Sequence, residues 1–193
     1  MRLVGDIALD AEVRAIASGA ITDGAPVVVN ADGTVGACVD AIALAIGSEV
    51  AYITNTSYLT TIHHTATFDS TNNRVVIAFK DGGAGGKAVV GTVSGTSISF
   101  GTPVQFESGA TESISLVHDN NSNRIVIGYT DDGDSNKAKS IVGTVDSSDN
   151  SISFGSIAVV NDATSSGISL VFDSNSNKVV YTYINASDNV GKA

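Results

Sequence analysis

One segment of the sequence is repeated twice with few substitutions. "FDSTNNRVVIAF" at 68–79 comes back as "HDNNSNRIVIGY" at 118–129 and as "FDSNSNKVVYTY" at 172–183. Three shorter motifs follow it in the same order. The first is "GKA", "NKA" and "GKA" at 86–88, 136–138 and 191–193. The others are "VGTV" at 90–93 and 142–145 and "SISFG" at 97–101 and 151–155. A period of roughly 50 residues indicates tandem copies of one supersecondary unit, and this limits the possible folds more than any local pattern does.

Each unit is predicted to contain four strands. In the second copy these are "SISLV" (113–117), "RIVIGYT" (124–130), "KAKSIVGTV" (137–145) and "SISFGSIAVV" (151–160). We expect a bulge or bend at Gly155 in the last of them. In the second strand, large apolar residues alternate on one face, while the other face is apolar but small at Gly128. A strand that is apolar on both faces is covered on both sides, and its small residues suggest that a neighbouring sheet approaches closely.

We therefore expect an all-β fold, with a small N-terminal adaptor that contains a β-hairpin, followed by tandem four-stranded repeats of roughly 50 residues arranged like β-propeller blades. A β-sandwich or a linear stack of β-meanders would give the same period, so both alternatives stay open. Composition agrees with an all-β chain, because Pro occurs twice, Trp never, and Gly 20 times. Such a mixture is typical of short strands joined by tight turns.

The predicted division of the chain is an attachment or adaptor segment, 1–40, and a repeat region, 41–193, with units at about 41–106, 107–160 and 161–193. Gly47, Gly101 and Gly155 are 54 residues apart, so "ALAIGSEVAY" (43–52) corresponds to a fourth strand. The last unit stops soon after its third strand begins. Apolar strand edges are usually covered, so we expect that the polypeptide continues beyond 193 or that another chain supplies the missing strands.

The first forty residues do not repeat. "LDAEVRAIASG" (9–19) predicts either a short helix capped by Gly19 or an extended arm. "APVVVNADGTVGACV" (25–39) predicts a β-hairpin, in which three valines precede an "NADG" turn and Val35 and Val39 continue on the return.

Charge and cysteine content exclude some classes of protein. The chain has 20 acidic and 10 basic residues, a net charge of −10, and no basic cluster, which argues against a non-specific nucleic-acid binder. The single cysteine, Cys38, excludes an intramolecular disulfide and fits a reducing compartment; with no adjacent His, it is not predicted to be a nucleophile. We identify no secretory signal and no apolar run of the roughly 18 residues that a membrane span needs.

The histidines are the first candidates for chemistry. His63 and His64 are adjacent, and neighbours in a strand point to opposite faces, so they are not expected to ligate one metal together. His64 takes the place of an Ile in the other copies, and His118 takes that of a Phe. We interpret them as variant core or edge positions, and a metal or receptor contact is the alternative.

A second candidate is the loop "DDGDSN", which offers Asp132, Asp134 and Asn136 at alternate positions, as calcium loops do. However, Lys137 stands where such loops have Gly, and Gly143 stands where they have Glu. The matching loop of the first copy, "DGGAGG" (81–86), has almost no ligands and lacks the Lys-Ser/Thr ending of a phosphate loop. We expect solvated hairpin turns, with calcium binding at 131–136 as the alternative.

The most regular polar feature is an Asp in each copy with an Asn four residues later, at Asp69, Asp119 and Asp173. Such an Asp at a strand end commonly accepts hydrogen bonds from the backbone of its own turn, and catalytic residues seldom recur in every copy. We therefore predict no catalytic residue, no metal ligand and no cofactor, and the protein is not expected to be an enzyme. The sequons at Asn55, Asn120 and Asn185 have no bearing without a secretory route.

The segment "ASGAITDGAPVVVNADGTVG" (17–36), followed by "FDSTNNRVVIAFKD…GKAVVGTVSGTSISFGTPVQFES" units, resembles repetitive virion-surface fibre proteins, tail-fibre-like, of marine tailed bacteriophages. The resemblance covers roughly 15–193 and transfers no catalytic residue. It implies a structural protein of the virion surface, assembled in the host cytoplasm and attached to other virion proteins through 1–40. Its repeats would extend towards a host-surface receptor or glycan.

The protein is expected to be a homo-oligomer that neither binds nucleic acid nor inserts into a membrane. A head decoration or head-fibre protein of the same virion is the nearest alternative. A carbohydrate-active propeller enzyme and a bacterial surface adhesin are the alternatives from other classes. The enzyme would need carboxylates or a nucleophile contributed by several blades, and the adhesin would need a secretion signal.

Overall fold

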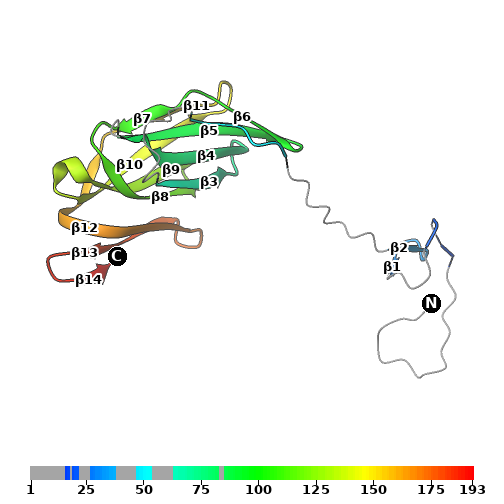
Figure 1. Cartoon of the computed structure of the whole chain (residues 1–193). Helices are drawn as coiled ribbons and strands as arrows, with labels where there is room; N and C mark the ends of the chain where they lie inside the picture. The colour runs from blue at the N-terminus through cyan, green and yellow to red at the C-terminus, as the bar shows by residue number, and fades with distance from the viewer. Residues whose placement is uncertain (1–15, 18, 22–26, 38–46, 54–62, 83–84) are drawn as a thin grey trace. The chain divides into compact units, whose positions relative to one another are not determined.

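The computed structural model describes residues 16–17, 19–21, 27–37, 47–53, 63–82 and 85–193. The chain divides into two compact units, Met1–Ile46 and Gly47–Ala193. The all-β class is confirmed, because the regular elements of the described residues are strands apart from 3-10 residues at Gly82 and in η2 (Asp132–Asp134) (Figure 1).

The predicted N-terminal hairpin is present. Strands β1 (Val27–Val29) and β2 (Val35–Ala37) pair in antiparallel fashion. In the turn between them, Asp32 Oδ1 accepts hydrogen bonds from the backbone N–H and the hydroxyl of Thr34, and Gly33 adopts a φ of +80°, which favours glycine. Val39, predicted to continue the return strand, lies outside the described residues.

The choice between a helix and an extended arm at 9–19 falls mostly outside the described residues. Within it, Ala17 forms a parallel bridge with Val35, and the backbone N–H of Val35 donates to the carbonyl oxygen of Ile16 at 2.9 Å. Backbone that pairs in this way is extended rather than helical at Ala17.

The larger unit begins with a five-stranded antiparallel sheet, which we call the first sheet. Its strands are β3 (His64–Asp69), β4 (Arg74–Lys80), β5 (Gly86–Ser94), β6 (Ser97–Phe100) and β7 (Val104–Glu107). They lie in the order β3-β4-β5-β6, and β7 also pairs with β5. The β-branched residues that fill β4 and β5 fit such a pleated, buried surface.

The remaining strands form one larger antiparallel sheet. They are β8 (Thr111–Asp119), β9 (Arg124–Asp131), β10 (Lys137–Asp146), β11 (Ser151–Phe154), β12 (Ala158–Asp173), β13 (Lys178–Asn185) and β14 (Val190–Lys192). Their order is β14-β13-β12-β10-β9-β8, with β11 also on β10.

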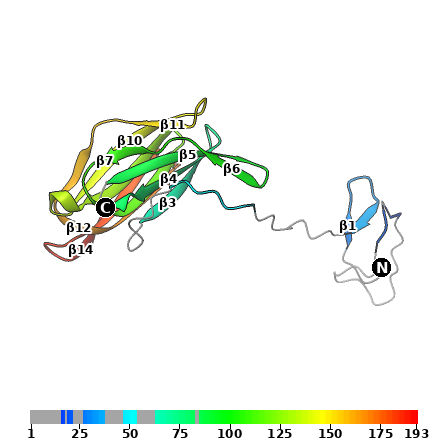
Figure 2. The ribbon, with the colours of Figure 1, turned by 45° about the horizontal axis from the view of Figure 1, so that its top comes forward.

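The long strand β12 belongs to two layers. Its residues 158–164 pair with β10, and its residues 165–173 pair with β13. It bends as it passes from one partner to the other (Figures 1 and 2). We call β8–β11 with residues 158–164 the middle layer, and residues 165–173 with β13 and β14 the last layer.

The four strands predicted within 113–160 are present, and the bulge or bend expected at Gly155 falls where the fourth strand is interrupted, at 155–157. The two pieces, β11 and β12, both pair with β10. One detail differs from the prediction. β12 then runs without a break into the strand expected separately at 167–171. The expected boundary between units, near 160, therefore falls inside a strand.

Strand β9 is buried on both faces, as predicted. Ile125, Ile127 and Tyr129 on one face are fully buried. On the other face, a Cβ added at Gly128 would lie 2.5 Å from the side chains of Leu170 and Tyr181 in the last layer. The first sheet and the middle layer share one apolar core, made of Val76, Ala78, Ala88, Val90, Phe106, Leu116, Ile125, Ile127, Tyr129, Ile141, Val145 and Ile152.

Candidate functional site

The recurring aspartates hold the turns at the ends of strands, as predicted. Asp119 Oδ1 accepts the backbone N–H groups of Asn121 and Ser122 at 2.9 and 3.1 Å, and the Ser122 hydroxyl donates to Oδ2 at 2.7 Å. The Ser122 hydrogen bond lowers the pKa of Asp119. Asp173 makes the same contacts with the two matching residues of its own turn. The Asn that follows each Asp by four has a left-handed φ, of 54°, 53° and 55° at Asn73, Asn123 and Asn177.

Asp69 has a second role. Its Oδ1 accepts the backbone N–H groups of Thr71 and Asn72, and the same oxygen lies 3.1 Å from Nε2 of His118 in the middle layer. The two side chains are only 2% and 5% exposed. Burial of His118 agrees with the prediction of a variant core position, but its pairing with Asp69 was not predicted. The available signal was a His in place of Phe directly before a recurring Asp.

Other polar side chains also join the first sheet to the middle layer. Arg74 Nε donates to Asn150 Oδ1 at 2.7 Å, and another guanidinium nitrogen donates to the carbonyl oxygen of Ser147. Glu112 receives His63 Nε2 at 2.6 Å and also the ammonium group of Lys80. These groups act as links between the two layers.

The adjacent histidines do not act together. His63 pairs with Glu112, whereas His64 is the first residue of β3, is exposed and lies opposite Phe79 in the strand register. The expectation that they do not share a ligand agrees with these positions. Among the described residues, no group of three or more His, Cys, Asp and Glu side chains is arranged to hold a metal ion.

The loop at 131–137 is a turn closed by ion pairs. Asp134 lies 3.0 Å from both Lys137 and Lys139, and Lys139 also lies 2.6 Å from Asp131. The hydrogen bonds from the two lysines lower the pKa of Asp134. Burial of the ammonium group opposes its charge, but the hydrogen bonds to the two carboxylates prevail and raise the pKa of Lys139. Lysine thus occupies Asp134, one of the two carboxylates predicted as calcium ligands, together with Asp131.

A buried carboxylate that the sequence did not reveal lies beside β9. Glu107 Oε2 accepts the hydroxyl of Tyr129 at 3.0 Å, and Oε1 accepts the backbone N–H groups of Ser108 and Gly109. Burial and the neighbouring charge of Glu107 both raise the pKa of Tyr129. Asp81, in the "DGGAGG" loop, is likewise held by a neighbouring side chain, because it forms an ion pair with Lys87 at 2.5 Å. Both carboxylates serve structural contacts.

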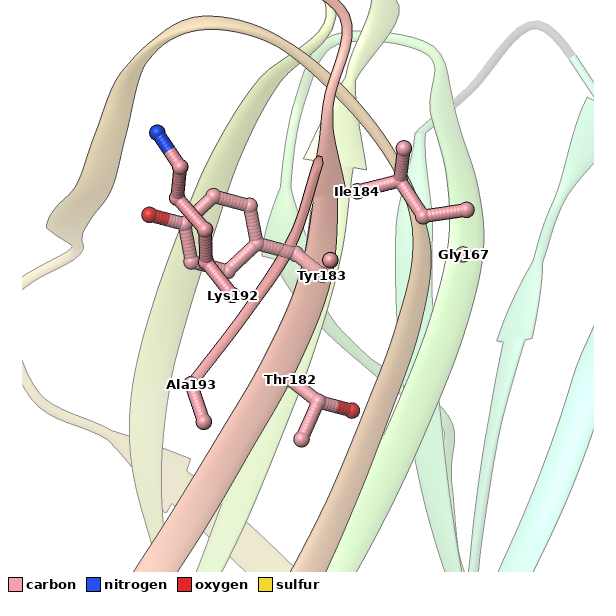
Figure 3. A pocket seen from close by; sticks show the side chains of 7 residues that line it. Gly167, Thr182, Tyr183, Ile184, Lys192 and Ala193 are labelled. Carbon is pink, nitrogen blue, oxygen red and sulfur yellow. The ribbon is translucent and has the colours of Figure 1, made fainter. Parts of the chain in front are cut away.

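A groove of about 390 Å³ opens at the end of the last layer. It is lined by residues of β12, β13 and β14 together with the final residue, namely Gly167, Thr182, Tyr183, Ile184, Gly191, Lys192 and Ala193 (Figure 3). Lys192, the cation of this set, pairs with Asp188 at 2.7 Å. β14 pairs with β13 on one side, and no described strand pairs with its other edge.

None of the described residues forms a helix that is long and apolar enough to cross a membrane. Comparison with known proteins found no matching family model, no matching curated protein and no matching solved structure.

Proposed function

We propose that the protein is a structural component of a bacteriophage virion, a tail-fibre or spike subunit. Residues 1–40 would anchor it to other virion proteins, and tandem β-repeats would extend towards the host surface. The proposal includes the finer fold prediction that the first sheet, the middle layer and the last layer are successive copies of one four-stranded unit. Of the arrangements left open by the sequence, we favour the linear stack.

The observation that supports the proposal best is a pair of aromatic contacts that recurs in the following unit, 54 residues later for Tyr52 and Phe100 and 50 residues later for Phe79. Tyr52 contacts Phe79 with ring centroids 5.2 Å apart, and Phe106 contacts Tyr129 at the same separation. The second contact of each residue recurs too, since Tyr52 lies 5.7 Å from Phe100 and Phe106 lies 5.9 Å from Phe154. Because each unit contacts the next one through the same aromatic positions, the contacts favour an extended array of units.

Two glycines support the same arrangement. A Cβ at Gly47 would lie 1.7 Å from the carbonyl oxygen of Thr96, and a Cβ at Gly101 would lie 2.1 Å from that of Asn150. Thr96 lies in the turn before β6, and Asn150 lies in the turn before β11. β6 and β11 each begin the fourth strand of the following unit. A stack built on one repeated contact serves as a stiff spacer, and many spacers on one particle allow weak contacts to the host surface to add up.

The use of the polar groups also favours a structural role. The carboxylates of Asp69, Glu107 and Asp131 are buried and are held by side chains and backbone N–H groups of the protein itself. The acidic surface, with a net charge of −10, favours solubility and keeps the chain away from other anionic surfaces.

The test is to locate the chain on intact phage particles by immuno-electron microscopy. Antibodies against 47–193 should label the tails of intact particles, whereas antibodies against 1–40 should label only particles that have been dissociated. Label on the heads would replace the fibre with the head-decoration alternative. Absence of the chain from purified particles would contradict a virion role, and release of sugars from host polysaccharide by the purified chain would favour the enzyme.

A further inference from the structure

Two of the three histidines lie at the boundary between the first sheet and the middle layer, each beside a carboxylate. His118 of β8 lies 3.1 Å from Asp69 at the end of β3, and His63, directly before β3, lies 2.6 Å from Glu112 of β8. The boundary between the middle layer and the last layer has no counterpart of the first pair, because Phe172 stands in the place of His118. This arrangement does not depend on where the protein functions, so the inference goes beyond the proposed function.

Asp69 is a buried carboxylate whose hydrogen-bond donors in its own turn are neutral. Its side chain is 2% exposed. The donors are the backbone N–H groups of Thr71 and Asn72, at 3.1 and 2.9 Å, and the side-chain amide of Asn72, at 2.8 Å. A charge that is removed from water is costly unless an opposite charge lies close to it. A cation beside Asp69 therefore stabilises the folded state more than it would at the surface.

Arg74 does not supply this cation, although it lies opposite Asp69 in the strand register. Its guanidinium donates to the side chain of Asn150 and to the carbonyl oxygen of Ser147 in the middle layer, and also to two carbonyl oxygens of its own turn. In the part of the chain that the structure describes, the imidazole of His118 is the one basic group within ion-pair distance of Asp69.

The charged groups that face His118 are carboxylates. Besides Asp69 there is Asp119, the next residue of β8. Arg124 lies opposite Asp119 in β9 and donates to carbonyl oxygens of its own turn. Nε2 of His118 also lies 3.5 Å from the amide oxygen of Asn123. Burial of the ring favours its neutral form, whereas the neighbouring carboxylates favour the imidazolium form.

The last layer lies on the other face of β8. There the hydroxyl of Ser115 accepts the backbone N–H of Leu170. His118 is on the face of β8 that meets the first sheet, and Ile125, opposite it in the register, is fully buried. In such apolar surroundings the attraction between an imidazolium ion and the Asp69 carboxylate is stronger than in water.

We propose that the boundary between the first sheet and the middle layer is a proton-dependent contact, with His118 as the group that takes up the proton. In mildly acidic solution the imidazole binds a proton from the solvent, and its Nε2–H donates to Oδ1 of Asp69 as part of a buried ion pair. Asp69 then has a countercharge, so the two layers are held together more strongly. Histidine suits this role because it is the side chain that changes charge between about pH 5 and 8.

Stability should therefore increase towards mild acid. The free energy of unfolding rises as pH falls wherever the folded chain binds more protons than the unfolded chain. The effect of His118 is expected above about pH 5. Carboxylates such as Asp119 and Asp134, whose pKa is lowered from the ordinary value of 3.8, are ionised in that range and do not obscure it.

The other two histidines differ from His118 in their surroundings. His63 shares Glu112 with Lys80, whose ammonium group already supplies a cation, and the side chain of His63 is 44% exposed. His64 is exposed and lies opposite Phe79. We expect both to contribute less to the pH dependence, and His64 serves as the control.

The first experiment measures urea unfolding of the full chain by circular dichroism at about pH 5.5 and about pH 8. We expect a higher midpoint at the lower pH for the wild type and for His64→Ile, which carries the Ile of the other two copies. His118→Phe, which carries the Phe of the other two copies, should lose most of this difference. Asp69→Asn keeps an acceptor for the turn but removes the charge, and it should lose the difference too. A wild type without the rise, or a rise in either of the last two variants as large as that of the wild type, would overturn the proposal.

The second experiment observes the imidazole directly, by long-range proton–nitrogen NMR of the folded wild type at about pH 5.5. The ring of His118 is assigned as the one whose signals are missing in His118→Phe. We expect both of its nitrogens to carry a proton while the fold is intact. A neutral ring in the folded chain at this pH would refute the ion pair, because burial would then outweigh the Asp69 carboxylate.

Discussion

Nε2 of His118 lies 3.1 Å from Oδ1 of Asp69, and this buried contact joins a turn of the first sheet to a strand of the middle layer. The same carboxylate oxygen also accepts two backbone N–H groups of its own turn. One side chain therefore fixes a local turn and a contact between layers. Asp173, which has the same local hydrogen bonds, is exposed.

The two roles can be separated by comparing Asp69→Ala with Asp173→Ala. Asp69→Ala removes the acceptor of the turn and the carboxylate that faces a buried imidazole, so we expect it to lower the free energy of unfolding by about 2–4 kcal/mol. Asp173→Ala loses only exposed turn hydrogen bonds and should cost less. Urea unfolding followed by circular dichroism measures both, and equal losses would mean that the His118 contact adds nothing.

The contact of Gly101 with the turn before β11 gives a second prediction. In Gly101→Ala, the new Cβ would meet the carbonyl oxygen of Asn150 at 2.1 Å, and backbone must move to relieve the clash. We expect a loss of about 1–3 kcal/mol in the free energy of unfolding, the usual range for overpacking.

Gly155→Ala is the matched control, because Gly155 has the corresponding position one unit later. Its Cβ would lie 3.7 Å from the nearest atom, the carbonyl oxygen of Val142, which is an ordinary contact. Its thermal unfolding should therefore stay close to that of the wild type. If the two variants unfolded at the same temperature, the close approach at Gly101 would not limit the stability of the protein.

Features with a local sequence signal were predictable. Strand β9 shows its alternation directly, and the Asp119 turn was expected because Asp, Asn and Ser favour such turns. Contacts between distant residues gave no such signal. The Glu107–Tyr129 hydrogen bond joins residues 22 positions apart, and it depends on how two layers pack. The packing of the Phe106 ring against Gly86 likewise becomes visible only once the structure brings the two strands together.

The ion pairs of the 131–137 loop predict that calcium has no effect on stability. Lys139 lies between Asp131 and Asp134, and its ammonium group already supplies the positive charge that these carboxylates need. The melting temperature should be the same in calcium chloride as in a chelator. A rise with calcium that the chelator reverses would show that the ion displaces the lysines.

The buried tyrosines predict a loss of stability in alkaline solution. Burial raises the pKa of Tyr129 and of Tyr181 above the ordinary tyrosine value of 10.0. Below pH 10.0 these hydroxyls are protonated whether the chain is folded or unfolded, so their contribution to stability is complete. Above that pH the unfolded chain ionises and the folded chain does not, so the free energy of unfolding falls as pH rises.

Tyrosinate absorbance and circular dichroism, recorded together during an alkaline titration, check this prediction. The last part of the absorbance rise should coincide with the loss of β-sheet signal, because Tyr129 and Tyr181 ionise only when the layers separate. In Tyr129→Phe the free energy of unfolding should fall less steeply with pH, although the variant starts from a lower stability because Glu107 loses the donor of a 3.0 Å hydrogen bond. Complete ionisation of all five tyrosines with an intact β-sheet spectrum would show that solvent reaches both hydroxyls in the folded protein.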